Sequence, residues 1–146
     1  MAHAARKVWW RVRKPRLNGC RVLVQDSTGR VLLVSHHYGS GNWMLPGGAM
    51  QRGEDPLSAA ARELAEEVGC RLEAAVLASV STEPLQGATN RVHLVAGTTT
   101  DKPVPDGREI AAVRWCDPCD LPANLSPAQR EGLPLWLKAA AAARQA

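Results

Sequence analysis

The sequence predicts an α/β fold, because short β-branched runs alternate with one well-capped amphipathic segment and the chain ends in an alanine-rich stretch. The 146 residues, 45% of them hydrophobic, are enough for one core and too few for two ordinary domains. We therefore expect a single domain over residues 1–146. Its ends are a basic, Trp-containing segment over 1–18 and a helical segment over 126–146.

Two apolar runs near the N-terminus predict a β-hairpin. Cys20–Gln25 and Val31–Ser35 are rich in β-branched residues and leucine, and the polar segment between them contains a glycine. Three later runs, over 71–82, 90–99 and 109–115, predict further strands that proline- and glycine-containing segments separate. We expect a mixed sheet that is antiparallel in part.

The segment between the hairpin and the first helix reads as a loop. Residues 36–46 are rich in glycine and turn residues, and they lead into Leu45-Pro46-Gly47-Gly48, which suits neither a helix nor a central strand.

A helix is predicted over 56–68. Asp55 suits the N-cap, Pro56 suits the first helical position and Gly69 suits the C-terminal stop. Apolar residues recur at helical spacing and predict a buried stripe: Leu57, Ala60, Ala61, Leu64 and Val68.

A second helix is predicted from Ser126. Ser126 and Gln129 have the spacing of a capping box, and the Ala-rich run up to Ala143 has high helix propensity. Pro134 should kink or divide this helix.

Three carboxylates crowd into barely one turn of the first helix. Glu63, Glu66 and Glu67 repel one another at a cost of roughly 0.2 to 0.5 kcal/mol per pair, so a bound divalent cation is the simplest reason for their presence. Oxygen ligands on a rigid helix suit Mg²⁺. Tetrahedral zinc fits less well, because the cluster contains no His or Cys.

The segment Gly48–Cys70 resembles the Nudix box, the signature of hydrolases that cleave nucleoside diphosphates linked to another group. The positions that carry the resemblance are Gly48, Glu54, Arg62, Glu63, Leu64, Glu66, Glu67 and Gly69. Cys70 departs from the aliphatic residue that is usual at its position, and a buried thiol fills the same role. The resemblance implies a Nudix-type α/β/α sandwich with a mixed central sheet, in which the box helix supplies the metal site.

The resemblance also implies roles for individual residues. Glu63, Glu66 and Glu67 would bind Mg²⁺, with Mn²⁺ as an alternative, and the backbone carbonyl near Gly48 would be a further ligand. Arg62 would pair with Glu66 and orient it. The structural positions of the box are Glu54 and Gly69. Glu54 would brace the loop, contact the metal through water, or be a solvated loop acid.

The general base is left open between two glutamates. Similar enzymes use either a box glutamate, here Glu63, or an acid from a later loop, here Glu109, with Asp106 and Glu83 behind it. His36, Trp43 and Glu83 are candidates for substrate binding. For His36 a solvated loop position competes with this role, and for Trp43 packing under the turn competes with it.

The charge distribution adds a possible partner. The formal net charge is +4, and six basic residues precede position 17 beside Trp9 and Trp10. Such a segment can contact nucleic acid or an anionic membrane, or it can pack its rings on the core. The substrate classes left open are nucleoside triphosphates, ADP-ribose, other sugar nucleotides and the 5′ end of RNA.

Other classes of protein fit less well. Trp115-Cys116-Asp117-Pro118-Cys119 resembles the thioredoxin redox motif, but too little chain follows it for that fold, and a lone CxxC lacks a second ligand pair for zinc. A catalytically idle Nudix-fold binding module has no use for three mutually repelling carboxylates. No apolar run reaches the ~20 residues of a membrane span, and we expect a cytoplasmic protein with reduced thiols. Similar proteins often form homodimers.

Overall fold

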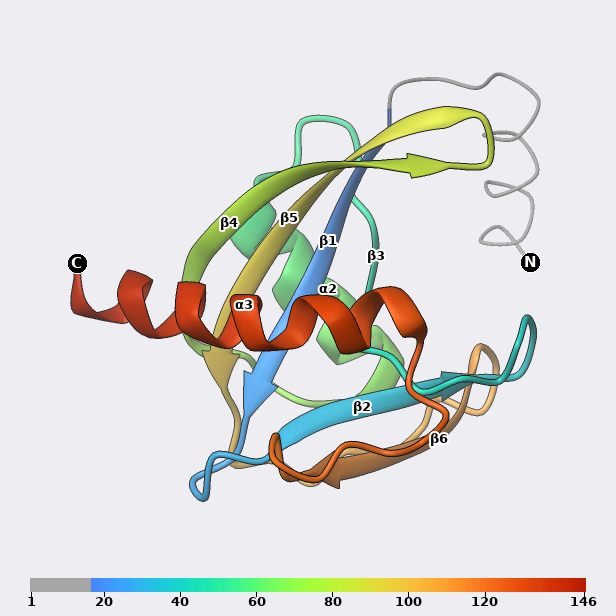
Figure 1. Cartoon of the computed structure of the whole chain (residues 1–146), viewed down its shortest axis with the longest axis vertical. Helices are drawn as coiled ribbons and strands as arrows, with labels where there is room; N and C mark the ends of the chain where they lie inside the picture. Colours follow the sequence, from blue (N-terminus) through green and yellow to red (C-terminus); the bar gives the residue numbers. More distant parts are fainter. Residues whose placement is uncertain (1–16) are drawn as a thin grey trace.

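The computed structural model describes residues 17–146, so most of the basic segment, including Trp9 and Trp10, lies outside the described residues. The elements are β1 (Leu17–Gln25), β2 (Val31–His36), β3 (Gly47–Ala49), α2 (Pro56–Val68), β4 (Glu73–Leu85), β5 (Ala88–Thr98), β6 (Ile110–Cys116) and α3 (Pro127–Gln145) (Figure 1). The sheet has the order β4-β5-β1-β2-β6, and β3 pairs with β1. The β1–β5 pair is parallel and the other pairs are antiparallel, which confirms the predicted mixed sheet.

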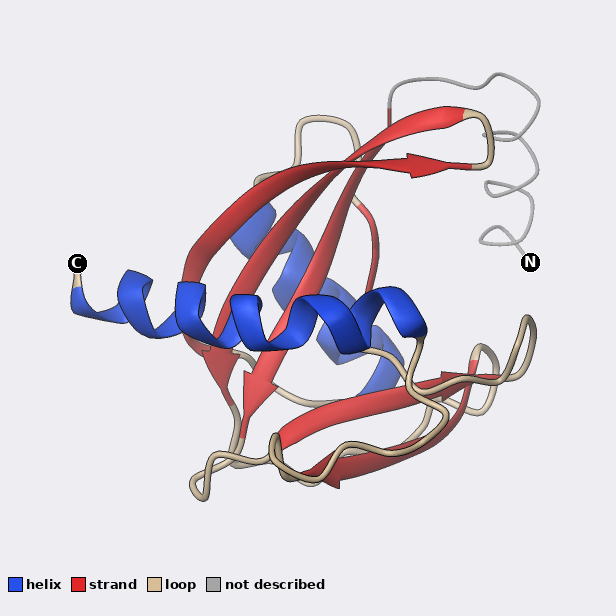
Figure 2. Cartoon of the chain, in the orientation of Figure 1, coloured by secondary structure: helices blue, strands red, loops and turns tan. Residues whose placement is uncertain are grey.

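Two helices cover opposite faces of the sheet. Figure 2 shows α3 crossing in front of the strands and α2 behind them. Successive residues of β1 alternate between the two cores: Val22 and Val24 pack in the cluster that contains Leu64 of α2, and Leu23 packs in the cluster that contains Leu133 of α3. This arrangement confirms the expected α/β/α sandwich.

The predicted hairpin is correct only at its turn. β1 and β2 are antiparallel neighbours, but their register is a single pair, Gln25 with Val31. Beyond that pair the segment 43–49 lies between them: Val22 N–H donates to the Pro46 carbonyl over 2.8 Å, and Val34 exchanges two backbone hydrogen bonds with Met44. The segment predicted as a loop therefore contains β3 and takes the hydrogen bonds that a hairpin would have made.

Gly47 allows β3 to approach β1 this closely. A Cβ at Gly47, whose φ is +153°, would clash with the carbonyl oxygen of Cys20 and lie 3.1 Å from the Cα of Arg21. A glycine in this turn is thus required by the close contact of two backbones.

The caps predicted for α2 are confirmed. The Asp55 side chain accepts from Ser58 N–H, Pro56 opens the helix, and Gly69 ends it with a φ of 70°. The predicted stripe is wrong at its edges, because Leu57 and Ala61 are exposed. The buried face is turned toward Ala59, Ala60, Glu63, Leu64, Glu67 and Val68. Two of the three crowded glutamates therefore lie on the face that packs against the sheet.

α3 is not divided at Pro134, and the predicted capping box is absent. α3 is continuous through Pro134, with Leu133 and Ala140 buried on either side, because packing on the sheet offsets the missing backbone hydrogen bond. No capping box forms, since the Ser126 side chain makes no capping hydrogen bond. The Gln129 side chain instead accepts from Leu45 N–H over 2.6 Å and ties α3 to the segment before β3.

The later strands are found close to their predicted ranges. β4 and β5 form a long hairpin, and Pro84 lies within β4 rather than in the connection. β4 is an edge strand, where proline is tolerated. Among residues 17–146, no helix has the length and apolar character needed to cross a membrane.

Candidate active site

Two buried glutamates of α2 face the glycines of β3. Glu67 is 2% exposed and accepts a hydrogen bond from Gly47 N–H over 3.1 Å. Glu63 is 3% exposed, and its carboxylate lies directly on Gly48, where a Cβ would come within 2.7 to 2.9 Å of its three terminal atoms. A side chain at position 48 would therefore displace the Glu63 carboxylate.

This burial raises the pKa of both carboxyl groups. For Glu67 desolvation is the main cause, the charge of Glu63 adds to it, and the hydrogen bond from Gly47 opposes it, so that the pKa rises to about 9. Desolvation also raises the pKa of Glu63, although the Arg62 guanidinium lowers it in part. The site thus concentrates buried acidic groups that a cation would stabilise in the charged form.

Glu66 is placed differently from the other two glutamates. Its side chain is 56% exposed, and it lies 3.4 Å from the Arg62 guanidinium. No three His, Cys, Asp or Glu side chains of the described residues are gathered closely enough to hold a metal ion together as they stand. The donor chemistry nevertheless fits a hard divalent cation, because two buried carboxyl groups meet at a backbone turn, and the Arg62 guanidinium that contacts Glu63 is bound mainly to Glu54.

Arg62 pairs with Glu66 as expected, over 3.4 Å, but its shortest contacts are with Glu54. Arg62 Nε and Nη2 donate to the two Glu54 oxygens over 2.8 and 2.9 Å, and Nη1 donates to Glu63 over 3.1 Å. Nη2 also donates to the Ala49 carbonyl, and Glu54 accepts from Gln51 N–H. Arg62 therefore fastens the segment after β3 to α2, and Glu54 braces that segment.

We expect Arg62→Lys to reduce hydrolysis by roughly tenfold to a hundredfold and to lower stability, because an ammonium cannot make the planar two-point contact with Glu54 and still reach Glu63. Michaelis kinetics and thermal melts would measure both effects. Arg71→Lys, at an exposed position after the box helix, is the matched control. Wild-type kinetics in Arg62→Lys would contradict this role.

The loop before β6 brings Glu109 to the site. Asp106 N–H and Val104 N–H donate to the last carbonyls of α2, those of Glu67 and Val68. The Asp106 carboxylate then accepts the backbone N–H groups of Arg108, Glu109 and Ile110. This arrangement brings Glu109 close enough for its charge to raise the pKa of Glu63 and Glu67.

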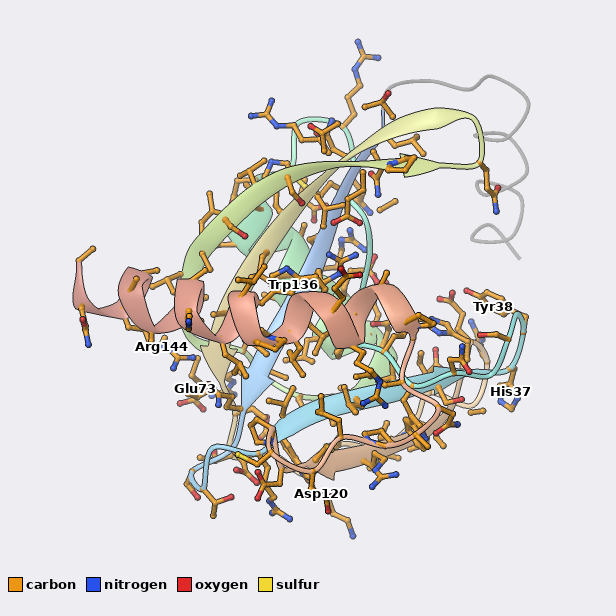
Figure 3. All side chains as sticks on the ribbon, in the orientation of Figure 1. His37, Tyr38, Glu73, Asp120, Trp136 and Arg144 are labelled. Carbon is orange, nitrogen blue, oxygen red and sulfur yellow. The ribbon has the colours of Figure 1, made fainter. Side chains whose placement is uncertain are left out.

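A pocket of about 250 Å³ opens where β2 ends. Its lining is His36, Tyr38, Gly39, Ser40, Gly41, Asn42 and Met44. His36 Nε2 lies 3.9 Å from Glu67, so the pocket begins at the acidic site. In Figure 3 Tyr38 and His37 lie on opposite sides of the ribbon beyond β2.

Trp43 and Glu83 have structural contacts away from the buried glutamates. Trp43 packs in the core under α3 and lies 5.5 Å from the Arg114 guanidinium. Glu83 forms a two-point ion pair with Arg21, which also lies 4.5 Å from the ring of Trp136. Figure 3 shows Trp136 on α3. Their predicted roles in substrate binding stay predictions.

Sequence reasoning missed two contributors to the site, Gly47 and Tyr38, and considered a third, Asp106, only as a candidate general base. Gly47 donates to Glu67, Asp106 organises the loop that carries Glu109, and Tyr38 donates to Glu109. The sequence offered a signal only for Gly47, which directly precedes the box. Asp106 and Glu109 are only three residues apart, whereas the contact between Tyr38 and Glu109 joins residues that are 71 positions apart in the chain.

Comparison with known proteins places the chain in a family. The family model described as NUDIX domain matches residues 15–136. A Bacillus subtilis protein described as putative 8-oxo-dGTP diphosphatase is 33% identical over 110 residues, which are 75% of this chain and 72% of that protein. The Xenopus laevis m7GpppN-mRNA hydrolase NUDT17 is 30% identical over 137 residues, with 80% of this chain and 46% of that protein covered.

A solved structure shows the same fold. The crystal structure of a MutT NUDIX hydrolase from Burkholderia pseudomallei superimposes with a TM-score of 0.73 at 28% identity, over 82% of this chain and 97% of that one. The chain belongs to the NUDIX family. It is a Nudix hydrolase that acts on phosphoric anhydride bonds of nucleotides.

Proposed function

We propose that this protein is a Mg²⁺-dependent pyrophosphatase that hydrolyses a nucleoside triphosphate, with ADP-ribose and other sugar nucleotides as related substrates. The observation that carries the proposal is the burial of Glu63 and Glu67 side by side against Gly47 and Gly48. Two buried carboxylates that lack an equal positive charge destabilise the folded protein. A divalent cation bound together with a phosphate substrate would remove this destabilisation, and the free energy gained would favour binding.

The residues of the site have different roles in this proposal. Glu63, Glu66 and Glu67 would hold the cation, Mg²⁺ or in its place Mn²⁺, together with the backbone at Gly48, on which the Glu63 carboxylate lies. The bound cation supplies charge neutralisation and Lewis-acid activation at phosphorus. Gly47 N–H fixes the orientation of Glu67, and Arg62 fixes that of Glu63.

Glu109 is our choice for the general base. Glu63 is held by Arg62 and pressed against Gly48, so its carboxylate has less freedom to exchange a proton with water. Glu109 is half-buried and lies between the acidic site and the pocket, since its partner Tyr38 lines the pocket. A water molecule beside Glu109 would lose a proton to that carboxylate as its oxygen attacks phosphorus. The bond between that phosphorus and the bridging oxygen then breaks, and the phosphate-containing fragment on the other side leaves with that oxygen.

The substrate class is supported by the pocket and by the relatives. The pocket of about 250 Å³ next to the acidic site lies a little below the roughly 300 Å³ at which ligand pockets usually begin, so it supports contact with part of a nucleotide. A relative described as a putative 8-oxo-dGTP diphosphatase favours nucleoside triphosphates. The relative described as an mRNA cap hydrolase favours RNA 5′ ends as the second candidate.

A substrate panel tests the proposal. The purified protein would be assayed with dGTP, 8-oxo-dGTP, ADP-ribose, a UDP-sugar, triphosphorylated RNA and capped RNA, each with Mg²⁺, Mn²⁺ or EDTA. We expect a nucleoside monophosphate and pyrophosphate from a nucleoside triphosphate, and no turnover in EDTA. Faster turnover of RNA would favour the second candidate. Nucleotide binding without turnover of any substrate would overturn the proposal and indicate an idle binding module.

Two further expectations belong to this proposal. Cys20, Cys70, Cys116 and Cys119 are all free thiols, which supports a reducing, cytoplasmic location. A homodimer stays a prediction that light scattering of the purified protein would test.

A further inference from the structure

Tyr38 and Glu109 come together although 71 positions separate them in the chain. The Tyr38 hydroxyl donates to Glu109 Oε1 over 2.9 Å. The two backbones are also joined, because His37 N–H donates to the Glu109 carbonyl over 2.8 Å. The contact therefore links the loop after β2 to the loop before β6.

Each loop is ordered by its own contacts. In the loop after β2, Gly39 and Gly41 have positive φ, and the Ser35 hydroxyl donates to the Gly41 carbonyl over 3.0 Å. In the loop before β6, the Asp106 side chain accepts Glu109 N–H. These contacts set the backbone positions, and the hydrogen bond from the Tyr38 hydroxyl acts on the side-chain torsions of Glu109.

We infer that Tyr38 is a positioning residue, which holds the Glu109 carboxylate between the pocket and the buried glutamates. The inference rests on the proposed role of Glu109 as general base. A glutamate that is half in water loses rotamer freedom only if a partner restrains it, and a hydrogen bond to a charged group is strong enough to do so. Tyr38 is itself 46% exposed, so its hydroxyl is not needed to fill the core.

The environment keeps Tyr38 in the form that can donate. Burial of part of its side chain, the hydrogen bond to Glu109 and the charges of Glu67 and Glu63 all raise the pKa of Tyr38 well above its ordinary value. The hydroxyl thus remains protonated over the working range of the enzyme. The same charges show that the Tyr38 hydroxyl is within electrostatic range of the acidic site.

The test is a double-mutant cycle with Tyr38→Phe, Glu109→Gln and the double variant, assayed on the nucleotide that the wild type turns over. Phenylalanine keeps the ring that lines the pocket and removes only the hydroxyl. We expect Tyr38→Phe to lower kcat by about tenfold with KM within about twofold, and to have no further effect in the Glu109→Gln background. Thr28→Val, which removes a hydroxyl from an exposed turn, is the matched control.

Several results would overturn the inference. An unchanged kcat in Tyr38→Phe, a rise in KM alone, or additive effects in the double variant would show that the hydroxyl does not act through Glu109. Unchanged kcat in Glu109→Gln would remove its premise, while turnover by the wild type would leave the hydrolase proposal standing. Crystal structures of both proteins give a readout apart from activity: the Glu109 carboxylate should be ordered in the wild type and displaced in Tyr38→Phe.

Discussion

Replacing Glu67 by glutamine is expected to lower kcat by on the order of a thousandfold or more, because an amide keeps the shape of the side chain and removes a charge that holds the cation. Glutamine should preserve the hydrogen bond from Gly47 N–H through its carbonyl oxygen. The loss of kcat would therefore result from the missing charge and not from disruption of the turn at Gly47. Glu131→Gln, at an exposed position of α3, is the matched control.

The same substitution should stabilise the metal-free protein above neutral pH. The pKa of Glu67 is raised in the folded state to about 9, so the folded protein retains a proton that the unfolded chain releases above its ordinary pKa of 4.5. This contribution to stability is complete below pH 4.5 and is lost progressively as the pH rises toward 9. Glutamine does not titrate, and at pH 8 it should add on the order of a few kcal/mol to the free energy of unfolding.

Thermal melts in EDTA and in Mg²⁺ between pH 5 and 9 measure this effect. The wild type in EDTA should lose stability over this range, and Mg²⁺ should restore it by binding only the folded state. Glu67→Gln should show a flatter pH dependence and a weaker response to Mg²⁺. If Glu67→Gln is less stable than the wild type at pH 8 in EDTA, the claim that burial of the charged Glu67 carboxylate destabilises the protein is wrong.

Gly48→Ala is expected to lower activity by roughly a hundredfold or more while the protein stays folded. The new Cβ would come within 2.9 Å of all three terminal atoms of the Glu63 carboxylate, which must then move. A shift of about 1 Å in a group that positions the reaction costs on the order of a hundredfold. The backbone can stay in place, because the atoms that give way belong to the end of a flexible side chain.

Two neighbouring glycines provide controls. Gly19→Ala places its Cβ no closer than 3.4 Å to its nearest neighbours, the side chain of Asn90 and the carbonyl oxygen of Gly48, and should leave kcat unchanged. Gly47→Ala meets the Cys20 backbone instead of a side chain and should prevent stable folding. Kinetics and circular dichroism on the three variants separate the two effects. Equal activity of Gly48→Ala and Gly19→Ala would show that hydrolysis does not depend on the position of the Glu63 carboxylate.

Local sequence signals predicted where helices and strands lie better than they predicted which strands pair with each other. The caps of α2 are encoded by Asp55, Pro56 and Gly69, which act within a few residues, and all three were found in place. The hairpin between β1 and β2 was predicted from the same kind of signal and holds at one residue pair only. The segment 43–49 takes the hydrogen bonds of β1 and β2 instead, because its glycines let it lie close to β1. Nothing in the sequence of the hairpin itself indicates that this segment will pair there.

The box alone determined the family and the set of crowded glutamates, because its spacing is local to one helix and the loop before it. Only the tertiary structure decided which glutamates are buried, that Arg62 is held mainly by Glu54, and that Tyr38 meets Glu109. The physical reason is that burial and long-range hydrogen bonds depend on how α2 and the loops pack on the sheet. Spacing along one segment carries no information about the side chains that a distant segment brings to it.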